Sequence, residues 1–390
     1  MDDRNTTDRT DVNVSLDTRK NIDARNVSEA SAGAILTIDL NAIRENYRRL
    51  KTKLGKARCA GVVKADAYGL DAAQVAPALA KEGCDAFFVA HVDEGMALRG
   101  ALGPVPKIYV LNGSPPGAEA ECTAHRLVPV INSLEQLEAW RQTAKTRDKK
   151  LPAVIQVDSG MSRLGMAPVE VERLAADLDA LEGISIDLVM SHLACADEPD
   201  NPANPLQRRN FETLRAKLPS APASFANSSG IFLGSDYHYD LARPGVALYG
   251  VNPTPGHPNP MLPVVSLSAK VIQTRELTGD TGVGYGHSFR TREPLVAATI
   301  SLGYADGWQR RTAGAAFFKG IRLPFAGRVS MDSIILDVSA LPPGTLKAGD
   351  LVDLIGKEQT VDEVAAIAGT IGYEVLTGFG KRFHRRYIGA

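Results

Sequence analysis

From residue 35 onward, short apolar runs alternate with longer stretches in which apolar residues recur at helical spacing. Residues 35–40 predict a strand and residues 41–50 an amphipathic helix, and residues 133–141 repeat the helical pattern behind a serine that suits a helix start. Apolar runs without polar interruption are typical of strands buried on both faces of a parallel sheet. Eight such runs follow one another, with helical segments between them: 59–63, 86–90, 108–111, 127–131, 153–157, 186–190, 223–226 and 246–249.

Eight strand–helix alternations predict an α/β fold with a TIM-type (β/α)8 barrel. Five prolines within residues 252–263 then mark a linker. We therefore expect the barrel to span residues 34–262 and a mainly β C-terminal domain to span residues 263–390, with one helix near 361–368. The strand-like runs of this second domain are 264–271, 295–302, 333–338 and 351–355.

Composition places the chain among soluble globular proteins. Of its 390 residues, 44% are hydrophobic and 23% charged, which allows two domains with large cores. The 44 basic and 45 acidic residues balance, so bulk charge gives no reason to expect binding to nucleic acid or to a membrane. The four cysteines are scattered without a Cys-x-x-Cys pair, so we expect no metal site and a reducing cytoplasm. Residues 1–33 are rich in Asp, Asn, Arg, Thr and Ser and contain no apolar stretch, which predicts a mostly disordered tail rather than a signal peptide.

Lys64 is the first candidate for chemistry. It lies where an apolar run ends and a loop begins. Apolar surroundings lower the pKa of an ammonium group, and the neutral amine is the form that condenses with an aldehyde. The other interpretation is a lysine whose charged end reaches solvent at the end of a strand, and the strand alone favours it.

The residues around Lys64 resemble a known motif. Val-Val-Lys-Ala-Asp-Ala-Tyr-Gly, residues 62–69, closely resembles the lysine motif of the alanine racemase family, whose members use pyridoxal 5'-phosphate (PLP). The resemblance implies that Lys64 carries the cofactor covalently and that Tyr68 helps to hold its phosphate. Leu70 stands where the family motif usually has a histidine. Further motifs of the family extend the resemblance over roughly residues 34–390 and imply that the first strand packs with the second domain.

Two further segments suit a phosphate group. In a TIM-type barrel the loops after the seventh and eighth strands often bind phosphate, and glycine amides with serine hydroxyls are suitable donors. Residues 226–230, Ala-Asn-Ser-Ser-Gly, and residues 243–250, Arg-Pro-Gly-Val-Ala-Leu-Tyr-Gly, resemble phosphate motifs of the family, although such clusters alone are usually plain turns. The phosphate contacts that the resemblance implies are Asn227, Ser228, Gly245, Val246 and, in segment 370–375, Tyr373.

Arg243 is implied by the same resemblance to donate a hydrogen bond to the pyridine nitrogen of PLP. Because an arginine does not readily give up a proton, that nitrogen stays largely unprotonated. The ring is then a weaker electron sink, which favours racemisation over side reactions such as transamination. Without the motif, a surface salt bridge would be the default interpretation of Arg243.

A second base is implied by Gly-Tyr-Ala-Asp-Gly at 303–307. Racemisation removes Hα from one face of a carbanion and returns a proton to the other face, which two groups on opposite sides do best. The resemblance assigns these roles to Lys64 and to Tyr304 of the partner subunit, with His192 linking the tyrosine to Arg243. It therefore implies a head-to-tail homodimer with two shared active sites.

Arg163 and Met331 are the implied substrate contacts. Arg163 is expected to meet the phenolic oxygen of the cofactor and the substrate carboxylate, and the Met331 amide to meet the same carboxylate. Many relatives carry a lysine, often carbamylated, whose negative charge positions this arginine, but this chain has the neutral Gln156. We hypothesise that a bound anion such as chloride, or another acidic residue, holds Arg163 instead.

The motifs leave the substrate range open. Alanine is the first choice, and a serine or broad-spectrum racemase is the nearest alternative. A basic amino-acid decarboxylase shares the architecture but favours a glutamate at the pyridine nitrogen, where this chain has Arg243. PLP-binding homeostasis proteins are single barrels and lack a second domain. By resemblance, the product D-alanine supplies bacterial cell-wall synthesis, and biosynthetic and catabolic roles both stay open.

Overall fold

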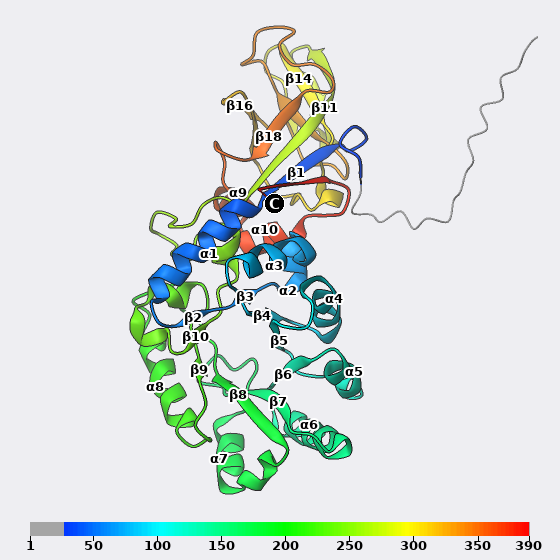
Figure 1. Cartoon of the computed structure of the whole chain (residues 1–390). Coiled ribbons are helices and arrows are strands. Elements are labelled where there is room, and N and C mark those ends of the chain that lie inside the picture. The colour runs from blue at the N-terminus through cyan, green and yellow to red at the C-terminus, as the bar shows by residue number, and fades with distance from the viewer. Residues whose placement is uncertain (1–26, 390) are drawn as a thin grey trace, which may run out of the picture.

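The structure is a computed structural model that describes residues 27–389. A barrel of alternating strands and helices forms one end of the molecule and a β domain forms the other, and α1 and α10 lie between them (Figure 1). Most of the predicted tail, residues 1–26, lies outside the described residues. The helices are α1 (Leu40–Leu54), α2 (Lys64–Gly69), α3 (Ala72–Lys81), α4 (Val92–Leu102), α5 (Glu119–Ala124), α6 (Leu134–Arg147), α7 (Pro168–Ala176), α8 (Ala203–Arg215), α9 (Val361–Ala368) and α10 (Gly372–Gly378).

The barrel strands pair in parallel and in chain order, as the apolar runs predict. Their centres are completely buried, for example Phe87, Val110, Val130 and Ile155. The first predicted strand of the barrel, residues 59–63, is divided into β2 and β3 at Ala60. The strands are β2 (Arg58–Cys59), β3 (Gly61–Val62), β4 (Ala86–Val89), β5 (Lys107–Val110), β6 (Leu127–Ile131), β7 (Leu151–Gln156), β8 (Ile184–Met190), β9 (Ala223–Ser224) and β10 (Leu241–Ala242).

The eighth strand of the barrel is β10, and the prediction of a strand at 246–249 is wrong. β10 pairs in parallel with β2, and the amide of Arg243 donates to the carbonyl of Ala226 next to β9, which closes the ring. Val246–Tyr249 instead forms a short 3₁₀ helix, η4, whose residues are all buried. An apolar run reports burial but does not distinguish a strand from a helical turn, and the preceding Pro244-Gly245 pair interrupts the strand ladder.

Helix α1 confirms the first predicted helix and is one turn longer. The carboxylate of Asp39 accepts hydrogen bonds from the amides of Asn41 and Ala42 and so caps its start. Tyr47 and Leu50 lie on its buried face. Helix α6 likewise begins after Ser133, whose side chain accepts from the amide of Gln136.

The second domain is built on the long strand β11, and the first strand of the chain belongs to its sheet. β1 (Ala34–Asp39) pairs antiparallel with β11 and parallel with the last strand, β19, which confirms the expected packing. The predicted helix at 361–368 is α9. The remaining strands are β11 (Val265–Leu277), β12 (Gly282–Val283), β13 (Phe289–Arg290), β14 (Leu295–Ile300), β15 (Ala315–Phe318), β16 (Ile321–Pro324), β17 (Ile334–Asp337), β18 (Leu351–Ile355) and β19 (His384–Ile388).

Residues 27–33, which the polar pattern assigns to a disordered tail, form a turn against this sheet instead. Ala32 is buried, and the ammonium of Lys270 donates to the carbonyl of Ala30 at 2.9 Å. Glu29 pairs with Arg386 of β19 at 2.6 Å. These contacts come from strands more than two hundred residues away, so local composition does not reveal them.

Candidate active site

Lys64 lies two residues after the end of β3, and the chain then turns in the left-handed helical region. Residues 65–68 have φ between 52° and 57°, a conformation that costs roughly 1–2 kcal/mol for each non-glycine residue. Two carboxylates hold the turn: Glu94 accepts from the amide of Ala65 at 2.7 Å, and Asp66 accepts from the amide of Ala72 at 2.8 Å. The turn therefore depends on one side chain within the lysine motif, Asp66, and on one outside it, Glu94.

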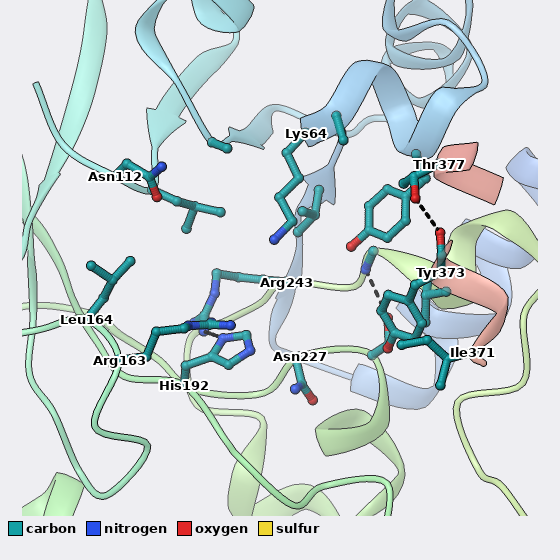
Figure 2. A pocket seen from close by; sticks show the side chains of 18 of the residues that line it. Lys64, Asn112, Arg163, Leu164, His192, Asn227, Arg243, Ile371, Tyr373 and Thr377 are labelled. Atoms are coloured by element: carbon teal, nitrogen blue, oxygen red, sulfur yellow. Dashed lines mark hydrogen bonds between the residues drawn. The ribbon is translucent and has the colours of Figure 1, made fainter. Parts of the chain in front are cut away.

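The side chain of Lys64 points into a cavity of about 920 Å³ at the carboxyl ends of the barrel strands (Figure 2). Arg163, His192 and Arg243 lie on one side of this cavity, and Tyr373 lies on another. The cavity collects the candidate residues of the barrel from segments far apart in the sequence. The sequence-predicted residues that line it are Lys64, Tyr68, Arg163, His192, Asn227, Ser228, Arg243, Gly245, Val246 and Tyr373.

Ser228 and Gly245 form a closely packed corner of the cavity. The hydroxyl of Ser228 accepts from the amides of Gly245, at 2.9 Å, and Ala247, at 3.2 Å. A Cβ atom at Gly245 would lie 2.3 Å from the hydroxyl oxygen of Tyr68. Only glycine lets the phenol approach the backbone this closely, so the corner brings hydroxyl and amide groups together as a phosphate site requires.

Three tyrosines line up beside this corner. The ring centroids of Tyr68 and Tyr249 are 4.7 Å apart, and those of Tyr68 and Tyr373 are 6.0 Å apart. Tyr249 donates to the carbonyl of Val62 at 2.8 Å and so fixes this group of tilted rings against β3. Burial raises the pKa of Tyr68 and raises that of Tyr373 to about 12, so both phenols stay protonated and can donate to an anion.

Arg243 is buried at the base of the cavity without a carboxylate partner within residues 27–389. Its guanidinium donates to the hydroxyl of Ser224 at 2.6 Å and to the carbonyl of Ser191 at 2.7 Å, and one nitrogen lies 3.4 Å from Nδ1 of His192. Burial lowers the pKa of Arg243 to about 9, which leaves it mostly charged at neutral pH. The Ser224 and Ser191 contacts fix the direction in which it can donate.

The electrostatics of the cavity favour neutral amines and bound anions. Burial, followed by the charge of Arg163, lowers the pKa of Lys64. Burial, followed by the charge of Arg243, holds the pKa of His192 well below its usual value. Among the described residues that line the cavity, Glu374 is the one carboxylate, and it bonds to Gln309 at 3.0 Å. A cavity with this charge suits a ligand that carries a phosphate and a phenolate.

Tyr304 and Met331 do not line the cavity with the other candidates. They lie together in the second domain, where the amide of Tyr304 donates to Ser330 and that of Ala305 to Met331. Tyr304 is 41% exposed and Met331 is 52% exposed. His192 is half-buried at the wall of the barrel cavity and makes no hydrogen bond to Tyr304 in the described part of this chain.

The chain matches the family models for the N-terminal domain of alanine racemase, over residues 38–253, and for its C-terminal domain, over residues 264–387. It is 68% identical to a catabolic alanine racemase of Mesorhizobium japonicum, over 93% of this chain and 95% of that protein. The chain belongs to the alanine racemase family. It is also 52% identical to a catabolic alanine racemase of Agrobacterium fabrum, over 94% of this chain and 95% of that protein.

Solved structures of alanine racemases have the same fold. The enzyme of Bartonella henselae, with covalently bound pyridoxal phosphate, is 44% identical with a TM-score of 0.88, over 92% of this chain and 100% of that one. The biosynthetic enzyme of Pseudomonas aeruginosa is 37% identical with a TM-score of 0.84, over 91% and 99% of the two chains. The barrel and the mainly β domain are thus the architecture of an alanine racemase.

Gln156, the last residue of β7, lines the racemase cavity, as Arg163 does. Its side chain is buried and neutral, whereas Arg163 is exposed and forms no ion pair within residues 27–389. Among the described residues, no acidic side chain is within ion-pair distance of Arg163. The hypothesis of a bound anion stays a prediction.

Sequence reasoning missed several residues that shape the racemase site. Glu94, in the first turn of α4, holds the Lys64 turn, and Ser224 holds Arg243. Neither belongs to a motif, and each becomes visible only when the barrel brings neighbouring strands together. Within residues 27–389, no helix has the length and apolar character needed to cross a membrane, and no group of acidic, histidine and cysteine side chains is arranged to hold a metal.

Proposed function

We propose that the chain interconverts L-alanine and D-alanine with PLP held on Lys64. The observation that carries this proposal is the Lys64 amine, whose pKa is lowered, in a cavity whose lining cations outnumber its carboxylates. A neutral amine suits the aldehyde of PLP, and the cations suit its phosphate and phenolate. The membership in the family, together with the bound cofactor of the Bartonella henselae enzyme, supports the same assignment.

The residues of the cavity fit this cofactor. Tyr68, Ser228 and Tyr373 offer hydroxyl donors, with Asn227 and the amides of Gly245 and Val246 close by, for the phosphate. Arg243 would meet the ring nitrogen and Arg163 the phenolate and the substrate carboxylate. PLP, when bound, withdraws electrons from the α-carbon of the amino acid and makes its hydrogen acidic. Arg243 donates without giving up a proton, which limits side reactions.

Two bases exchange the α-proton in this proposal. Lys64 removes or returns a proton on one face of the substrate, and Tyr304 of the partner subunit does so on the other. The exposed position of Tyr304 and Met331, outside the cavity of their own chain, supports a contribution to a second chain. We therefore propose a head-to-tail homodimer in which each cavity is completed by the second domain of the partner.

The decisive experiment is α-proton exchange of L-alanine in D₂O by the purified PLP-loaded protein, followed with a chiral assay. Deuterium incorporation with equal amounts of both enantiomers supports the two-base racemase. Exchange with retained L configuration would mean that Lys64 acts alone, and absence of exchange with PLP bound would contradict alanine as substrate. L-serine, run in parallel, tests the broader substrate range.

The Tyr304→Phe variant separates this proposal from a PLP carrier. In a PLP carrier, loss of the Tyr304 hydroxyl would leave PLP binding unchanged and there would be no turnover to lose. A racemase would lose turnover in both directions and still bind PLP. A decarboxylase would release carbon dioxide from a basic amino acid, which Arg243 in place of a glutamate disfavours. Both assays use the same preparation.

For the physiological role we propose alanine catabolism in the bacterial cytoplasm. The relatives at 68% and 52% identity are both catabolic alanine racemases, which favours this role over the supply of cell-wall D-alanine. The free cysteines in the described structure suit a reducing compartment. A bacterial strain that lacks the gene for this chain would support the catabolic role if it fails to grow on alanine as nitrogen source but needs no added D-alanine. A requirement for D-alanine would favour the cell-wall role.

A further inference from the structure

We infer that Arg382 is a positioning residue that holds the Tyr304 and Met331 loops in one fixed arrangement for the reaction. This inference rests on the proposed function for its kinetic consequences. Arg382 lies between α10 and β19, outside the cavity and outside every motif of the lysine and phosphate sites.

Arg382 joins the two loops through two carboxylates. Its Nε atom donates to Asp306 at 2.7 Å, and its Nη1 atom donates to Asp332 at 2.7 Å. Asp306 ends the 3₁₀ turn η6 (Tyr304–Asp306), and Asp332 directly follows Met331. One planar guanidinium therefore fixes the distance between the loop of the second base and the loop of the substrate contact.

The carboxylate of Asp306 links Arg382 to the turn that carries Tyr304. Its second oxygen accepts from the amide of Gly303 at 2.9 Å and so caps the turn that carries the tyrosine. Asp306 is buried, whereas Arg382 is half exposed. Loss of the arginine would leave a buried carboxylate without its cation, which is a strong reason for the turn to rearrange.

Backbone contacts make the three segments a single packed unit. The amide of Gly380 donates to the carbonyl of Asp306 at 3.0 Å. A Cβ atom at Gly303 would lie 2.2 Å from the carbonyl oxygen of Met331, and one at Gly307 would lie 1.9 Å from that of Gly378. With such close backbone approach, a small shift of one segment displaces the others.

The cofactor corner of the same chain has contacts of its own that do not include Arg382. Tyr373 is carried by α10, which packs on the Lys64 turn: a Cβ atom at Gly69 would lie 2.6 Å from the carbonyl oxygen of Leu376. Arg385 adds a hydrogen bond to the carbonyl of Gly69 at 2.6 Å. Removal of the Arg382 side chain is therefore expected to disturb the two loops while PLP stays bound.

The test compares Arg382→Gln and Arg382→Lys with the wild type and with Arg386→Gln as a matched control. Arg386 is also an exposed, ion-paired arginine of the C-terminal segment, but its partner is Glu29. Because an error of about 1 Å in placement can cost about 100-fold in rate, we expect Arg382→Gln to lower kcat about 10- to 100-fold. Arg382→Lys keeps the positive charge but lacks the planar guanidinium that reaches both carboxylates, so it should recover part of this loss.

Two readouts distinguish positioning from general damage. The α-proton exchange of one enantiomer, which faces Tyr304, should slow far more than that of the other, which faces Lys64, with bound PLP and dimer mass unchanged. Independently of activity, hydrogen–deuterium exchange at the amides of residues 303–305 should become faster in Arg382→Gln and stay unchanged in Arg386→Gln.

Equal slowing of both enantiomers, loss of PLP, or unchanged amide exchange in Arg382→Gln would overturn the inference. If wild-type protein fails to exchange alanine, the proposed function fails, and the amide exchange of residues 303–305 still decides the role of Arg382. Behaviour of Arg382→Gln identical to that of Arg386→Gln would show that the two carboxylates hold the loops without the arginine.

Discussion

The two regions that carry the candidate residues are built in opposite ways. The cofactor side of the barrel cavity is formed within one chain: Arg243 and Ser228 are buried and hydrogen-bonded, and a Cβ atom at Gly245 would meet Tyr68. The second-domain loops are ordered by Asp306 and Arg382, yet present Tyr304 at the surface. A cofactor that stays bound suits a rigid set of contacts within one chain, whereas a group proposed to act in another subunit must be exposed before assembly.

Lys64→Ala would remove the function of the barrel cavity altogether. We expect a loss in kcat of about 10⁴-fold, because the covalent hold on PLP and one of the two bases disappear together. Racemisation and the absorbance of bound PLP are measured on the same sample. Lys217→Ala, which removes a surface lysine paired with Glu172, should match the wild type. Substantial activity in Lys64→Ala would contradict the assignment of the base.

Tyr304→Phe would test the second-domain loops. The expected loss in kcat is about 100- to 1,000-fold in both directions, since only one face of the substrate keeps its base. Bound PLP should be unchanged because the phenol is not among the proposed contacts of the cofactor, which come from the barrel cavity and α10. Loss of PLP from this variant would place Tyr304 in the cofactor site instead.

Mixed dimers would show directly whether the two regions meet across an interface. Chains with Lys64→Ala and chains with Tyr304→Phe are unfolded and refolded together, so that half of the dimers pair one of each. In a composite site, each mixed dimer has one intact cavity, and activity should return to about a quarter of the wild-type value. If both bases came from one chain, mixing would restore nothing.

Gly245→Ala would disturb the cofactor corner with a single methyl group. The new Cβ atom meets the hydroxyl oxygen of Tyr68 at 2.3 Å, so we expect overpacking of about 1–3 kcal/mol and a roughly tenfold weaker hold on PLP. Equilibrium dialysis of PLP and thermal unfolding of the apoprotein measure the two effects. Gly100→Ala on α4, where a Cβ atom has no neighbour within 4 Å, is the matched control. Equal PLP affinity in both variants would mean that Tyr68 moves aside freely.

The smallest effect that we expect is a contribution of His192 to the pH dependence of the apoprotein's stability. The pKa of His192 is lowered mainly by burial. Below the ordinary histidine pKa of about 6.5, the side chain is therefore protonated in the unfolded chain but still neutral in the folded chain. Stability is therefore retained above that pH and lost as the pH decreases. His192→Gln should flatten this slope in urea unfolding curves measured from pH 7.5 to 5. An unchanged slope would attribute the acid sensitivity to other groups.

The sequence predicted the barrel better than the contacts that complete it. Seven apolar runs became strands of the parallel barrel because buried parallel strands leave a direct signal in composition. The run 246–249 became η4 because helix and strand look alike in a short buried segment. The residues 27–33 were assigned to a tail because their partners, Lys270 and Arg386, lie at the other end of the chain.

By itself the sequence determined the local features of this racemase: the alternating elements, the lysine at the end of a strand, and the motifs that mark the family. Only the tertiary structure decided that β10 closes the barrel, that Glu94 holds a left-handed turn after Lys64, and that Arg382 joins two loops. The physical reason is that periodicity records which side chains are buried. Hydrogen-bond partners and charges are chosen between segments that meet only after folding.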